Sequence, residues 1–372
     1  MAPLVWLACP GLDHARRGFE TFARECFEAL RNRDDLRIEL VKGSGPSAPQ
    51  ERSIPTLLRD SAVARALARG RLREPFVVEH LSYAASLLPR LVQRPPDVVY
   101  FSEWHLGRVL GAWRRRVGGR FRLVLCNGGA VAQGYGHLDL VQQFMPGARD
   151  YAVALGEPAE RQVVLPLGVV LPPFKPLGEH ERRALRARLG LPTERRVVIS
   201  VAALNDSHKR IGYLIEEIAR MPAPRPYLLL IGHAERETPP LRALAAQRLG
   251  SDGHDIRSVA PAAVGEQLRA ADAFVLTSLW ESFGRVLVEA LGHGLPVLAH
   301  EHPVMRWVLG DEGDVADLRQ PRAVAEWLGG ARSHDRSEPA QRRRHEAAYE
   351  RFSWDTLAPR YAEMLRSVAP ET

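Results

Sequence analysis

Two glutamates, Glu281 and Glu289, stand eight positions apart in the segment LWESFGRVLVEALGHGLPVLAH, residues 279–300. Carboxylates can act as the acid and base of a hydrolase, hold the hydroxyl groups of a ligand, or remain solvated surface charges. One continuous helix over residues 281–289 would separate the two glutamates by about 12 Å. The paired carboxyl groups of glycosidases lie only roughly 5 to 9.5 Å apart. The spacing therefore argues against a hydrolytic pair.

The residues around the two glutamates favour a ligand-holding role. AFVLTS is typical of a buried strand, LWESFG of a turn, and RVLVEALGHG of a helix that ends before Pro296, with Ser282 as a candidate N-cap. A strand, a tight turn and a helix amino terminus bring backbone N–H groups and the positive end of the helix dipole together, which predicts a phosphate site. Glu289, near mid-helix, suits the vicinal hydroxyls of a ribose, and Glu281 suits another hydroxyl-bearing group beyond the phosphate.

The elements that must position these residues follow an alternating pattern. Strand candidates in the amino half are PLVWLAC, RIELV, DVVYF, FRLVLC, YAVAL and QVVLPL, and those in the carboxyl half are RRVVISVAAL, YLLLIG, IRSVA, AFVLTS and LPVLA. Longer segments with helical spacing separate them, so we predict α/β parallel sheets covered by helices. A stretch rich in Pro and Gly at about 166–177 divides the two halves. We expect two Rossmann-like doubly wound domains facing a cleft, with ligands at the carboxyl ends of the strands.

Composition and charge exclude several classes of protein. With 45% hydrophobic and 26% charged residues, the 372-residue chain is typical of a globular protein. The net charge is +7, but only Lys42, Lys175 and Lys209 are lysines among 51 basic residues. Such an arginine bias is more simply explained by genome composition than by a partner, and no nucleic-acid-binding module accompanies it. We expect no nucleic-acid partner.

The cysteines and the amino terminus indicate the compartment. Cys9, Cys26 and Cys126 are too few and too scattered for a disulfide framework or a zinc site, which suggests a reducing compartment. MAPLVWLACPG lacks the positive region of a signal peptide, so we interpret it as a first buried strand. No uninterrupted apolar stretch approaches the roughly 18 residues of a membrane span. We expect a cytoplasmic protein.

The opening segment resembles the E-x7-E signature of retaining glycosyltransferases with the GT-B fold, in particular the large GT4 family. The matching residues are Ser278 to Glu281, Phe283-Gly284, Glu289-Ala290, Gly294 and Leu295-Pro296. The resemblance covers most of the carboxyl half, through RALRARLGLPTERRVVISVAALNDSHKRIGYLIEEIA, LLLIG and VGEQLRAADAFVLTSLWESFG, and it is weaker in the amino half. It implies an acceptor-side domain at 1–168, a nucleotide-sugar-binding domain at 169–353, and a final helix at about 354–372 that packs back on the first domain.

The same resemblance implies an activity. Such an enzyme moves a hexose from a UDP- or GDP-linked donor to a hydroxyl acceptor, which can be a glycan, a lipid-linked molecule or a small molecule. It retains the configuration of the sugar and uses no metal and no bound cofactor. The acceptor attacks from the face of the leaving group, and a phosphate oxygen takes its proton. We therefore expect a transferase of polysaccharide or glycoconjugate biosynthesis.

Residue roles follow from the matching positions. In the family pattern, Glu289 binds the donor ribose, Glu281 the transferred sugar, and Lys209 the diphosphate leaving group. The backbone amides of Phe283 and Gly284, in the turn that also holds Ser282, would contact the sugar or the diphosphate.

One departure from the family pattern concerns the diphosphate. The family usually places an arginine a few residues before the lysine, where this chain has Ala203 or Leu204. An aliphatic side chain cannot donate the two hydrogen bonds that a guanidinium gives to a phosphate, so His208 or Arg210 would have to contact the diphosphate instead. The departure motivates an alternative, a non-catalytic (degenerate) nucleotide-sugar-binding partner protein. A glycan phosphorylase or an epimerase is a further alternative, although a phosphorylase would carry a pyridoxal lysine in a longer chain.

The acceptor side should come from the amino half. In CPGLDHARRGFE, which includes Arg16 and Arg17, the resemblance makes Gly11 and Gly18 places where the backbone nears the donor phosphates. His105, Asn127 and His137 follow predicted strands and are candidates for acceptor contacts. Of these we take His137 as the catalytic candidate.

The arginine-rich run AWRRRVGGRFR, residues 112–122, is a candidate surface for anionic lipid headgroups, with Trp113 at the interface. The alternative is a solvated helix end. The first interpretation predicts peripheral contact with the inner membrane face.

Overall fold

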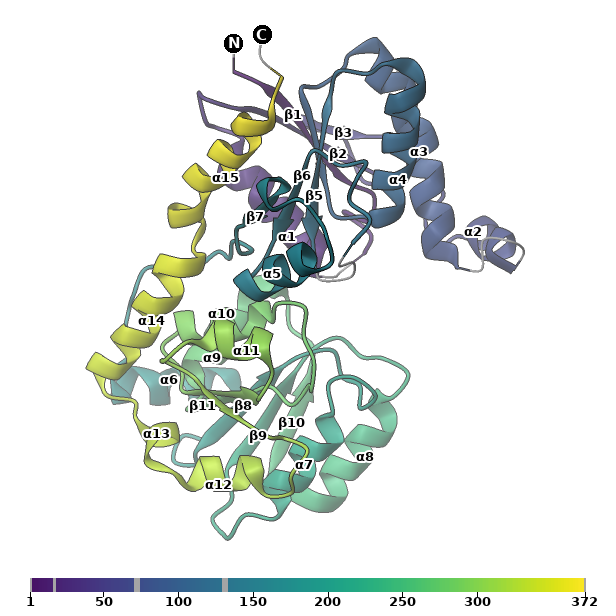
Figure 1. Cartoon of the computed structure of the whole chain (residues 1–372). Coiled ribbons are helices and arrows are strands. Elements are labelled where there is room, and N and C mark those ends of the chain that lie inside the picture. Colours follow the sequence, from purple (N-terminus) through teal and green to yellow (C-terminus); the bar gives the residue numbers. More distant parts are fainter. Residues whose placement is uncertain (1, 16–17, 70–73, 129–132, 371–372) are drawn as a thin grey trace. The chain divides into compact units, whose positions relative to one another are not determined.

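The computed structural model describes residues 2–15, 18–69, 74–128 and 133–370. The chain divides into two compact units (Figure 1). Unit 1 consists of Met1–Val170 and Phe352–Thr372, and unit 2 of Leu171–Arg351. The predicted domains were 1–168 with the helix at about 354–372, and 169–353. The chain therefore leaves unit 1 once and returns to it once.

Unit 1 is built on a parallel sheet of the order β3-β2-β1-β4-β5-β6-β7 within the described residues. Its strands are β1 (Leu4–Cys9), β2 (Arg37–Lys42), β3 (Glu51–Ser53), β4 (Val98–Phe101), β5 (Arg122–Asn127), β6 (Leu140–Gln143) and β7 (Gln162–Val164). Its helices are α1 (Gly18–Leu30), α2 (Ala62–Leu67), α3 (Pro75–Gln93), α4 (Trp104–Val117), α5 (Pro146–Ala154) and α15 (Trp354–Val368). Helices α3 and α4 cover one face of the sheet, and α1 and α15 cover the other (Figure 1).

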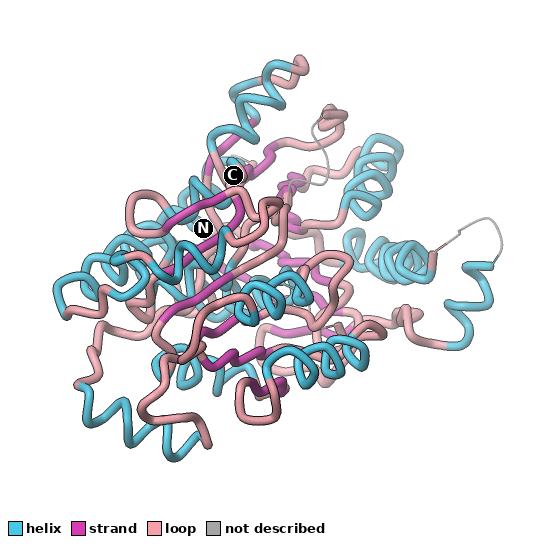
Figure 2. Tube along the Cα trace, turned by 90° about the horizontal axis from the view of Figure 1, so that it is seen from below, coloured by secondary structure: helices cyan, strands magenta, loops and turns pink. Residues whose placement is uncertain are grey.

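Unit 2 repeats this architecture with a parallel sheet of the order β10-β9-β8-β11-β12-β13. Its strands are β8 (Val197–Val201), β9 (Tyr227–Ile231), β10 (His254–Arg257), β11 (Ala273–Val275), β12 (Val297–His300) and β13 (Asp314–Ala316). Its helices are α6 (Glu179–Leu189), α7 (Ile211–Ala219), α8 (Thr238–Leu249), α9 (Val264–Ala270), α10 (Arg285–Gly292), α11 (Pro303–Leu309), α12 (Ala323–Gly329), α13 (Ala331–His334) and α14 (Glu338–Phe352). Within each unit, helices flank the strands (Figure 2). Two doubly wound α/β units, as predicted, are confirmed.

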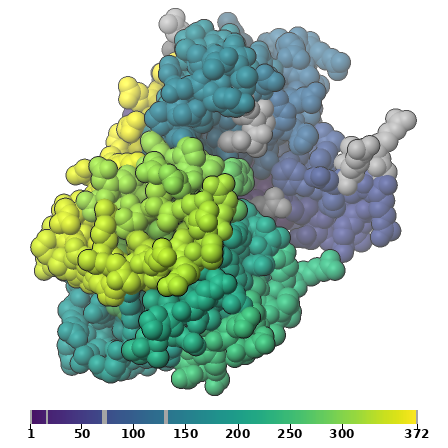
Figure 3. All heavy atoms as spheres, turned by 60° about the horizontal axis from the view of Figure 1, so that its bottom comes forward, coloured from purple at the N-terminus to yellow at the C-terminus, as the bar shows by residue number. Residues whose placement is uncertain are grey.

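The core of unit 2 explains why its strands run parallel. Apolar side chains of β8, β9 and β11 are buried on both faces of the sheet, as parallel strands require. Helices α7, α8 and α12 pack on one face, through residues such as Leu214, Leu241 and Val324. In Figure 3 the yellow-green segment after β12 forms one continuous part of the surface of unit 2.

The return of the chain to unit 1 depends on close packing around Trp354. The N–H of Val169 donates to the carbonyl of Phe352 at 2.8 Å. A Cβ on Gly168 would lie 2.4 Å from the indole of Trp354, so only glycine fits there. The indole N–H of Trp354 donates to Glu25 of α1 at 3.1 Å. These contacts attach α15 to α1.

Some predicted strands were wrong or incomplete. YAVAL, residues 151–155, belongs to helix α5 and the residue that ends it, because Pro146 suits the first turn of a helix and alanine favours helical backbone. The short strands β3, β6 and β13 were not predicted, because ERS, LVQQ and DVA contain too few consecutive apolar residues to indicate a strand.

Candidate functional site

The predicted diphosphate lysine and the predicted sugar-binding glutamate meet at the switch point of the unit 2 sheet. Strand order reverses between β8 and β11, and ligands of doubly wound sheets bind at the carboxyl ends of the strands there. Lys209 lies in the segment after β8, and Glu281 in the segment after β11. The Lys209 Nζ donates to Glu281 Oε1 at 2.5 Å, and the two side chains are 16% and 12% exposed. The cation and the carboxylate are therefore paired and still accessible.

The turn that carries Lys209 is held by buried polar side chains. The Asn205 Oδ1 accepts the backbone N–H groups of His208, at 3.2 Å, and Lys209, at 2.8 Å. The Thr277 hydroxyl donates to the Lys209 carbonyl at 2.8 Å. Asn205 and Thr277 are both buried, so the backbone at Lys209 is tied to the segments after both strands. Sequence analysis did not identify Asn205 or Thr277.

Ser278 positions the carboxylate of Glu281. The Ser278 hydroxyl donates to Glu281 Oε1 at 2.6 Å, on the same oxygen that accepts from Lys209. Ser278 is fully buried, whereas the next aromatic residue, Trp280, is 53% exposed. Sequence analysis also missed Trp280. An aromatic residue beside an acid in a loop after a buried strand is the signal that could have identified it as a contact for a sugar or a base.

The predicted glycine turn leads directly into helix α10. Gly284 adopts a left-handed φ of +79° and is the N-cap of α10, which begins at Arg285. The expectation that Ser282 caps this helix is therefore wrong; Ser282 is exposed. Because Glu281 lies before the helix, the separation calculated for a continuous helix over residues 281–289 does not apply. The backbone still presents a helix amino terminus in the loop after β11, as an anion site requires.

The other predicted donor-site residues lie on the same elements. Phe283 is 3% exposed and packs edge-on against Trp307, with ring centroids 6.4 Å apart. Its side chain anchors the turn, which leaves the backbone for any ligand contact. Glu289 lies in the second turn of α10 and is half-buried. The ligand roles of Phe283, Gly284 and Glu289 stay predictions.

The positions where the family usually has an arginine contain no cation. Leu204 is 2% exposed and belongs to the core of unit 2. Arg210 donates to the Leu318 carbonyl at 2.7 Å and lies over the Tyr213 ring, so its guanidinium is already engaged. The exposed His208 donates a ring N–H to the carbonyl of Trp280 at 3.2 Å. Of the two replacements considered, His208 is the one whose side chain contacts Trp280, the neighbour of Glu281 in the chain.

The switch point of unit 1 lies between β1 and β4 and contains Gly11. A Cβ at Gly11 would lie 2.3 Å from Glu20 Oε1 and 2.9 Å from Arg59 Nη2, so a side chain there would have to displace the ends of both. Gly18 is the exposed first residue of α1. Arg16 and Arg17 lie outside the described residues. Gly11 thus approaches a carboxylate rather than open space, and its contact with donor phosphates stays a prediction.

A buried ion pair lies beside Gly11. Arg59 donates through Nε and Nη2 to the two oxygens of Glu79, at 2.8 and 2.7 Å, and its backbone N–H donates to Glu79 as well. His14 contacts the same carboxylate at 3.2 Å. Burial by itself would raise the pKa of Glu79, but hydrogen bonds from Arg59 and His14 hold it well below its usual range. No motif in the sequence indicated this pair.

The predicted acceptor residues differ in accessibility. The Asn127 amide donates to Tyr135 at 3.0 Å and to Gln143 at 2.9 Å in the interior of unit 1, whereas His105 is exposed on α4. His137 packs against α4, and its Nε2 is buried without a hydrogen-bond partner among the described residues. Burial, followed by nearby arginines, lowers the pKa of His137.

His137 nevertheless lines a pocket. The pocket has a volume of about 370 Å³ and includes Arg108 and Arg115 of α4. A basic pocket in unit 1 is compatible with an acceptor that carries an anionic group. The catalytic role of His137 stays a prediction.

The arginine-rich run ends helix α4, but Trp113 does not lie at an exposed interface. Its ring packs against the core of unit 1, and its indole nitrogen is buried. Arg114 pairs with Asp139, which leaves Arg115 and Arg116 as the exposed cations at this helix end. No helix among the described residues is long and apolar enough to span a membrane.

Known proteins with similar sequences are glycosyltransferases. The chain is 31% identical over 228 residues to a D-inositol 3-phosphate glycosyltransferase of Xylanimonas cellulosilytica, which covers 59% of this chain and 54% of that protein. The chain spans about half the length of the curated relatives it matches.

Solved structures show the same fold along the whole chain. A sucrose-phosphate synthase from Thermosynechococcus elongatus has a TM-score of 0.78 at 18% identity, covering 98% of this chain and 99% of its own. Anabaena HepE in complex with UDP-glucose has a TM-score of 0.73 at 16% identity, covering 98% and 100%. The predicted GT-B fold is therefore confirmed.

The family model that matches unit 2 is described as "Glycosyl transferases group 1" and covers residues 181–347. The match includes Lys209, Glu281 and the whole of α10, and it agrees with the family predicted from the sequence. Residues 181–347 of this chain thus form a domain of the glycosyl transferases group 1 family.

Proposed function

We propose that this protein is a retaining hexosyltransferase that uses a UDP- or GDP-linked sugar and a hydroxyl acceptor, without a metal. The observation that carries the proposal is the pair of Lys209 and Glu281, 2.5 Å apart at the switch point of a group 1 glycosyltransferase domain. A mobile cation and a carboxylate at this place suit a phosphate and a sugar, respectively.

The chemistry requires stabilisation of the leaving group. When the bond between the sugar carbon and the diphosphate oxygen breaks, its electron pair stays on the diphosphate and positive charge develops on the sugar ring. Preorganised donors at that diphosphate are the main catalytic resource. Lys209 and the amino terminus of α10 would supply them. The acceptor oxygen then bonds to the sugar carbon, and its proton passes to a phosphate oxygen.

Donor binding would rearrange the ion pair. Without a donor, Glu281 Oε1 accepts from both Lys209 and Ser278. A diphosphate carries more negative charge than a single carboxylate, so Lys209 would turn to it and leave Glu281 with Ser278. Glu281 would then accept hydroxyl groups of the hexose, and Glu289 those of the ribose. The amides of Phe283 and Gly284 would complete the donor site.

The acceptor and the location belong to the same proposal. A glycan, a lipid-linked molecule or a small molecule would offer the hydroxyl group, with His137 on the acceptor side. We place the protein in the cytoplasm, with peripheral contact at the inner membrane face through Arg115 and Arg116, which are exposed at the end of α4. Anabaena HepE, which shares the fold, has been solved with UDP-glucose, and this supports a UDP-linked donor.

Thermal unfolding with UDP, GDP or ADP tests the donor site. A nucleotide at roughly a hundred times its dissociation constant should stabilise the fold by about 2.7 kcal/mol. We expect one nucleotide to raise the Tm of the parent chain, and Glu289→Ala to remove that rise. Glu326→Ala, at an exposed helical position of the same unit, should keep it. A rise that survives Glu289→Ala would contradict the ribose role of Glu289.

The absence of the family's usual arginine at Ala203 or Leu204 favours one alternative, a degenerate nucleotide-sugar-binding partner protein. Leu204 is buried where the family usually has an arginine, and Arg210 is engaged with Leu318. Radiolabelled donor sugars that match the stabilising nucleotide separate the two functions. Sugar transfer to water or to an acceptor supports the enzyme. Nucleotide binding with neither reaction supports the partner protein.

A further inference from the structure

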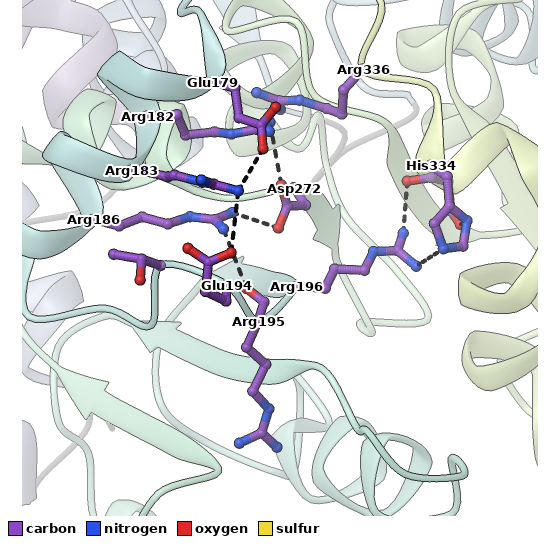
Figure 4. Close-up of a pocket in the computed structure, with 12 residues that line it drawn as sticks. Glu179, Arg182, Arg183, Arg186, Glu194, Arg195, Arg196, Asp272, His334 and Arg336 are labelled. Atoms are coloured by element: carbon purple, nitrogen blue, oxygen red, sulfur yellow. Dashed lines mark hydrogen bonds and ion pairs between the residues drawn. The ribbon is translucent and has the colours of Figure 1, made fainter.

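A pocket of unit 2 lies at the edge of the sheet opposite the candidate donor site. It has a volume of about 330 Å³ and is formed by α6, the starts of β8 and β11, and the segment between α13 and α14 (Figure 4). Arg196 directly precedes β8, and Asp272 directly precedes β11. Lys209 and Glu281 follow the other ends of the same two strands. The pocket is thus separate from the donor site.

The pocket is strongly basic. Three carboxylates line it together with six arginines, which are Arg182, Arg183, Arg186, Arg195, Arg196 and Arg336. Arginines at a solvent-facing helix end are common, but these line one cavity and come from three segments of the chain. The distribution of their partners decides which of them are available to a ligand.

The carboxylates are already paired. Asp272 accepts from Arg186 at 2.5 Å, lies 3.4 Å from Arg182, and also accepts the backbone N–H of Val197. Arg183 lies 2.9 Å from Glu179 and 3.2 Å from Glu194. These contacts use all three acids of the pocket.

Arg195 is also committed elsewhere. Its side chain points away from the other arginines (Figure 4) and donates to the carbonyls of Arg225, at 2.5 Å, and Asp252, at 3.0 Å. Arg195 therefore adds positive charge near the pocket, but its guanidinium is not available to a ligand there.

Arg196 and Arg336 have no carboxylate partner among the described residues. Arg196 donates to the carbonyls of Leu328, at 2.6 Å, and Ser333, at 2.7 Å, and contacts His334. The Nε and Nη1 atoms of Arg336 are buried and make no hydrogen bond within the described part of the chain. Figure 4 shows Arg336 reaching across the pocket toward Glu179 and Arg182, but no contact joins them.

Such an arrangement is unfavourable without an anion. Burial lowers the pKa of Arg336 to about 10, so Arg336 remains protonated at neutral pH, and burial also lowers the pKa of Arg196. A buried charge without a partner costs the fold stability. An oxyanion with several acceptor oxygens would satisfy the free donors of Arg336 and neutralise the excess charge.

We propose that this pocket is a second anion site, which binds inorganic phosphate or the phosphoryl group of a small metabolite through Arg336, with the positive charge of Arg196 nearby. Guanidinium groups match the geometry of phosphate oxygens, and the volume suits a small phosphorylated molecule. Bound phosphate would contact the segment between α13 and α14, where Arg336 lies. The site does not depend on the identity of the donor or of the acceptor.

Phosphate binding by the full chain tests the proposal. Isothermal titration calorimetry and Tm are measured with inorganic phosphate and with glycerol 3-phosphate, against sodium chloride at equal ionic strength. We expect saturable binding and a Tm that rises with phosphate concentration.

Arg336→Gln should weaken binding at least about tenfold. Arg342→Gln, which removes an exposed arginine of α14 outside the pocket, should bind as the parent does. Tighter binding of glycerol 3-phosphate would assign the site to an organic phosphate.

The candidate donor site also attracts phosphate, so Lys209→Met provides the second control. This variant should keep the phosphate-dependent rise in Tm. Equal binding by Arg336→Gln and the parent overturns the proposal, and so does loss of binding in Lys209→Met.

Hydrogen exchange of the parent chain gives a test that needs no variant. Phosphate should slow exchange in residues 179–186 and 333–338, which line or adjoin the pocket. Slowed exchange confined to residues 205–211 and 281–287 would place the anion at the donor site and overturn the proposal.

Discussion

The switch points of the two sheets carry ion pairs of different kinds. In unit 1, Arg59 holds both oxygens of Glu79, whose side chain has 0% exposed area. In unit 2, Lys209 contacts one oxygen of Glu281, and the two side chains keep 16% and 12% of their area exposed. The two units share one architecture but use the same place in the sheet differently.

The difference follows from the two cations. A guanidinium forms two parallel hydrogen bonds with a carboxylate, and breaking them in a buried place leaves a charge without a partner. An ammonium on a flexible stem exchanges one acceptor for another at little cost. We infer that the pair of Arg59 and Glu79 is structural, and that the pair of Lys209 and Glu281 is available to a ligand.

The largest effect is expected from Glu79→Gln. It takes away the short carboxylate contacts of Arg59, which keeps the more distant carboxylate of Glu20 at 4.0 Å, and removing one member of a buried pair typically costs about 3–5 kcal/mol. Hydrogen exchange should show faster opening of unit 1, with unit 2 unchanged. Glu28→Gln, which removes a carboxylate that is 49% exposed, should change stability by no more than about 1 kcal/mol. Equal effects of the two variants would remove the distinction between the switch points.

Lys209→Met should abolish most of the proposed sugar transfer with little loss of stability. Removing one preorganised donor to a developing anion typically lowers kcat about 10²–10³-fold. The measurement is the initial rate of transfer from the matching sugar nucleotide, together with the Tm. Lys175→Met, at an exposed lysine of the same unit, is the control. If Lys209→Met lowers the Tm so far that unfolding accounts for the whole loss of transfer, the pair of Lys209 and Glu281 is structural as well.

The two units should also respond differently to acid. Burial lowers the pKa of His293 in unit 2 from 6.5 to about 4, so the unfolded state binds more protons across that range and unit 2 loses stability as pH falls through it. Glu79 has a depressed pKa, so its contribution to unit 1 is full above its ordinary value of 4.5 and is lost below it. The pKa of His137 in unit 1 is lowered as well, but that of His293 is shifted further, so hydrogen exchange at several pH values should show unit 2 weakening more than unit 1 as pH falls toward 4.

The matched variants for this acid response are His293→Gln and His180→Gln. The first should flatten the response of unit 2 between pH 6.5 and about 4. The second, at an exposed position of α6, should leave it unchanged. If unit 1 weakens before unit 2 in the parent chain, the assignment of the two groups is wrong.

The smallest effect is expected from Thr277→Val. This substitution keeps the shape of the side chain and removes the hydroxyl that donates to the Lys209 carbonyl. Loss of one such hydrogen bond costs about 1 kcal/mol, which corresponds to roughly a fivefold lower rate if it loosens Lys209. Thr193→Val, at the opposite edge of the sheet, is the control. Unchanged transfer would show that the turn does not depend on Thr277.

Local patterns predicted the parts of the molecule that depend on neighbours in the sequence. The apolar run LVWLAC forms β1, and the turn WESFG leads into α10. Both were predictable because the burial of a strand and the start of a helix depend on residues that are adjacent in the sequence. The prediction of a strand at YAVAL was wrong because a short run of alanine and β-branched residues suits both a strand and a helix. Pro146, at the first turn, favours the helix. The interpretation of Trp113 as a residue at a membrane interface was wrong because arginines follow it in the chain, whereas apolar core residues surround it in space.

The sequence by itself determined the two doubly wound units, the family of residues 181–347 and the location of Lys209 and Glu281 after strands. Only the tertiary structure decided which charges meet. It pairs Arg59 with Glu79, engages Arg210 with Leu318, and leaves Arg336 without a carboxylate partner among the described residues. The physical reason is that periodicity reports which residues are buried in one element, whereas an ion pair depends on side chains that distant elements bring within a few ångströms of each other.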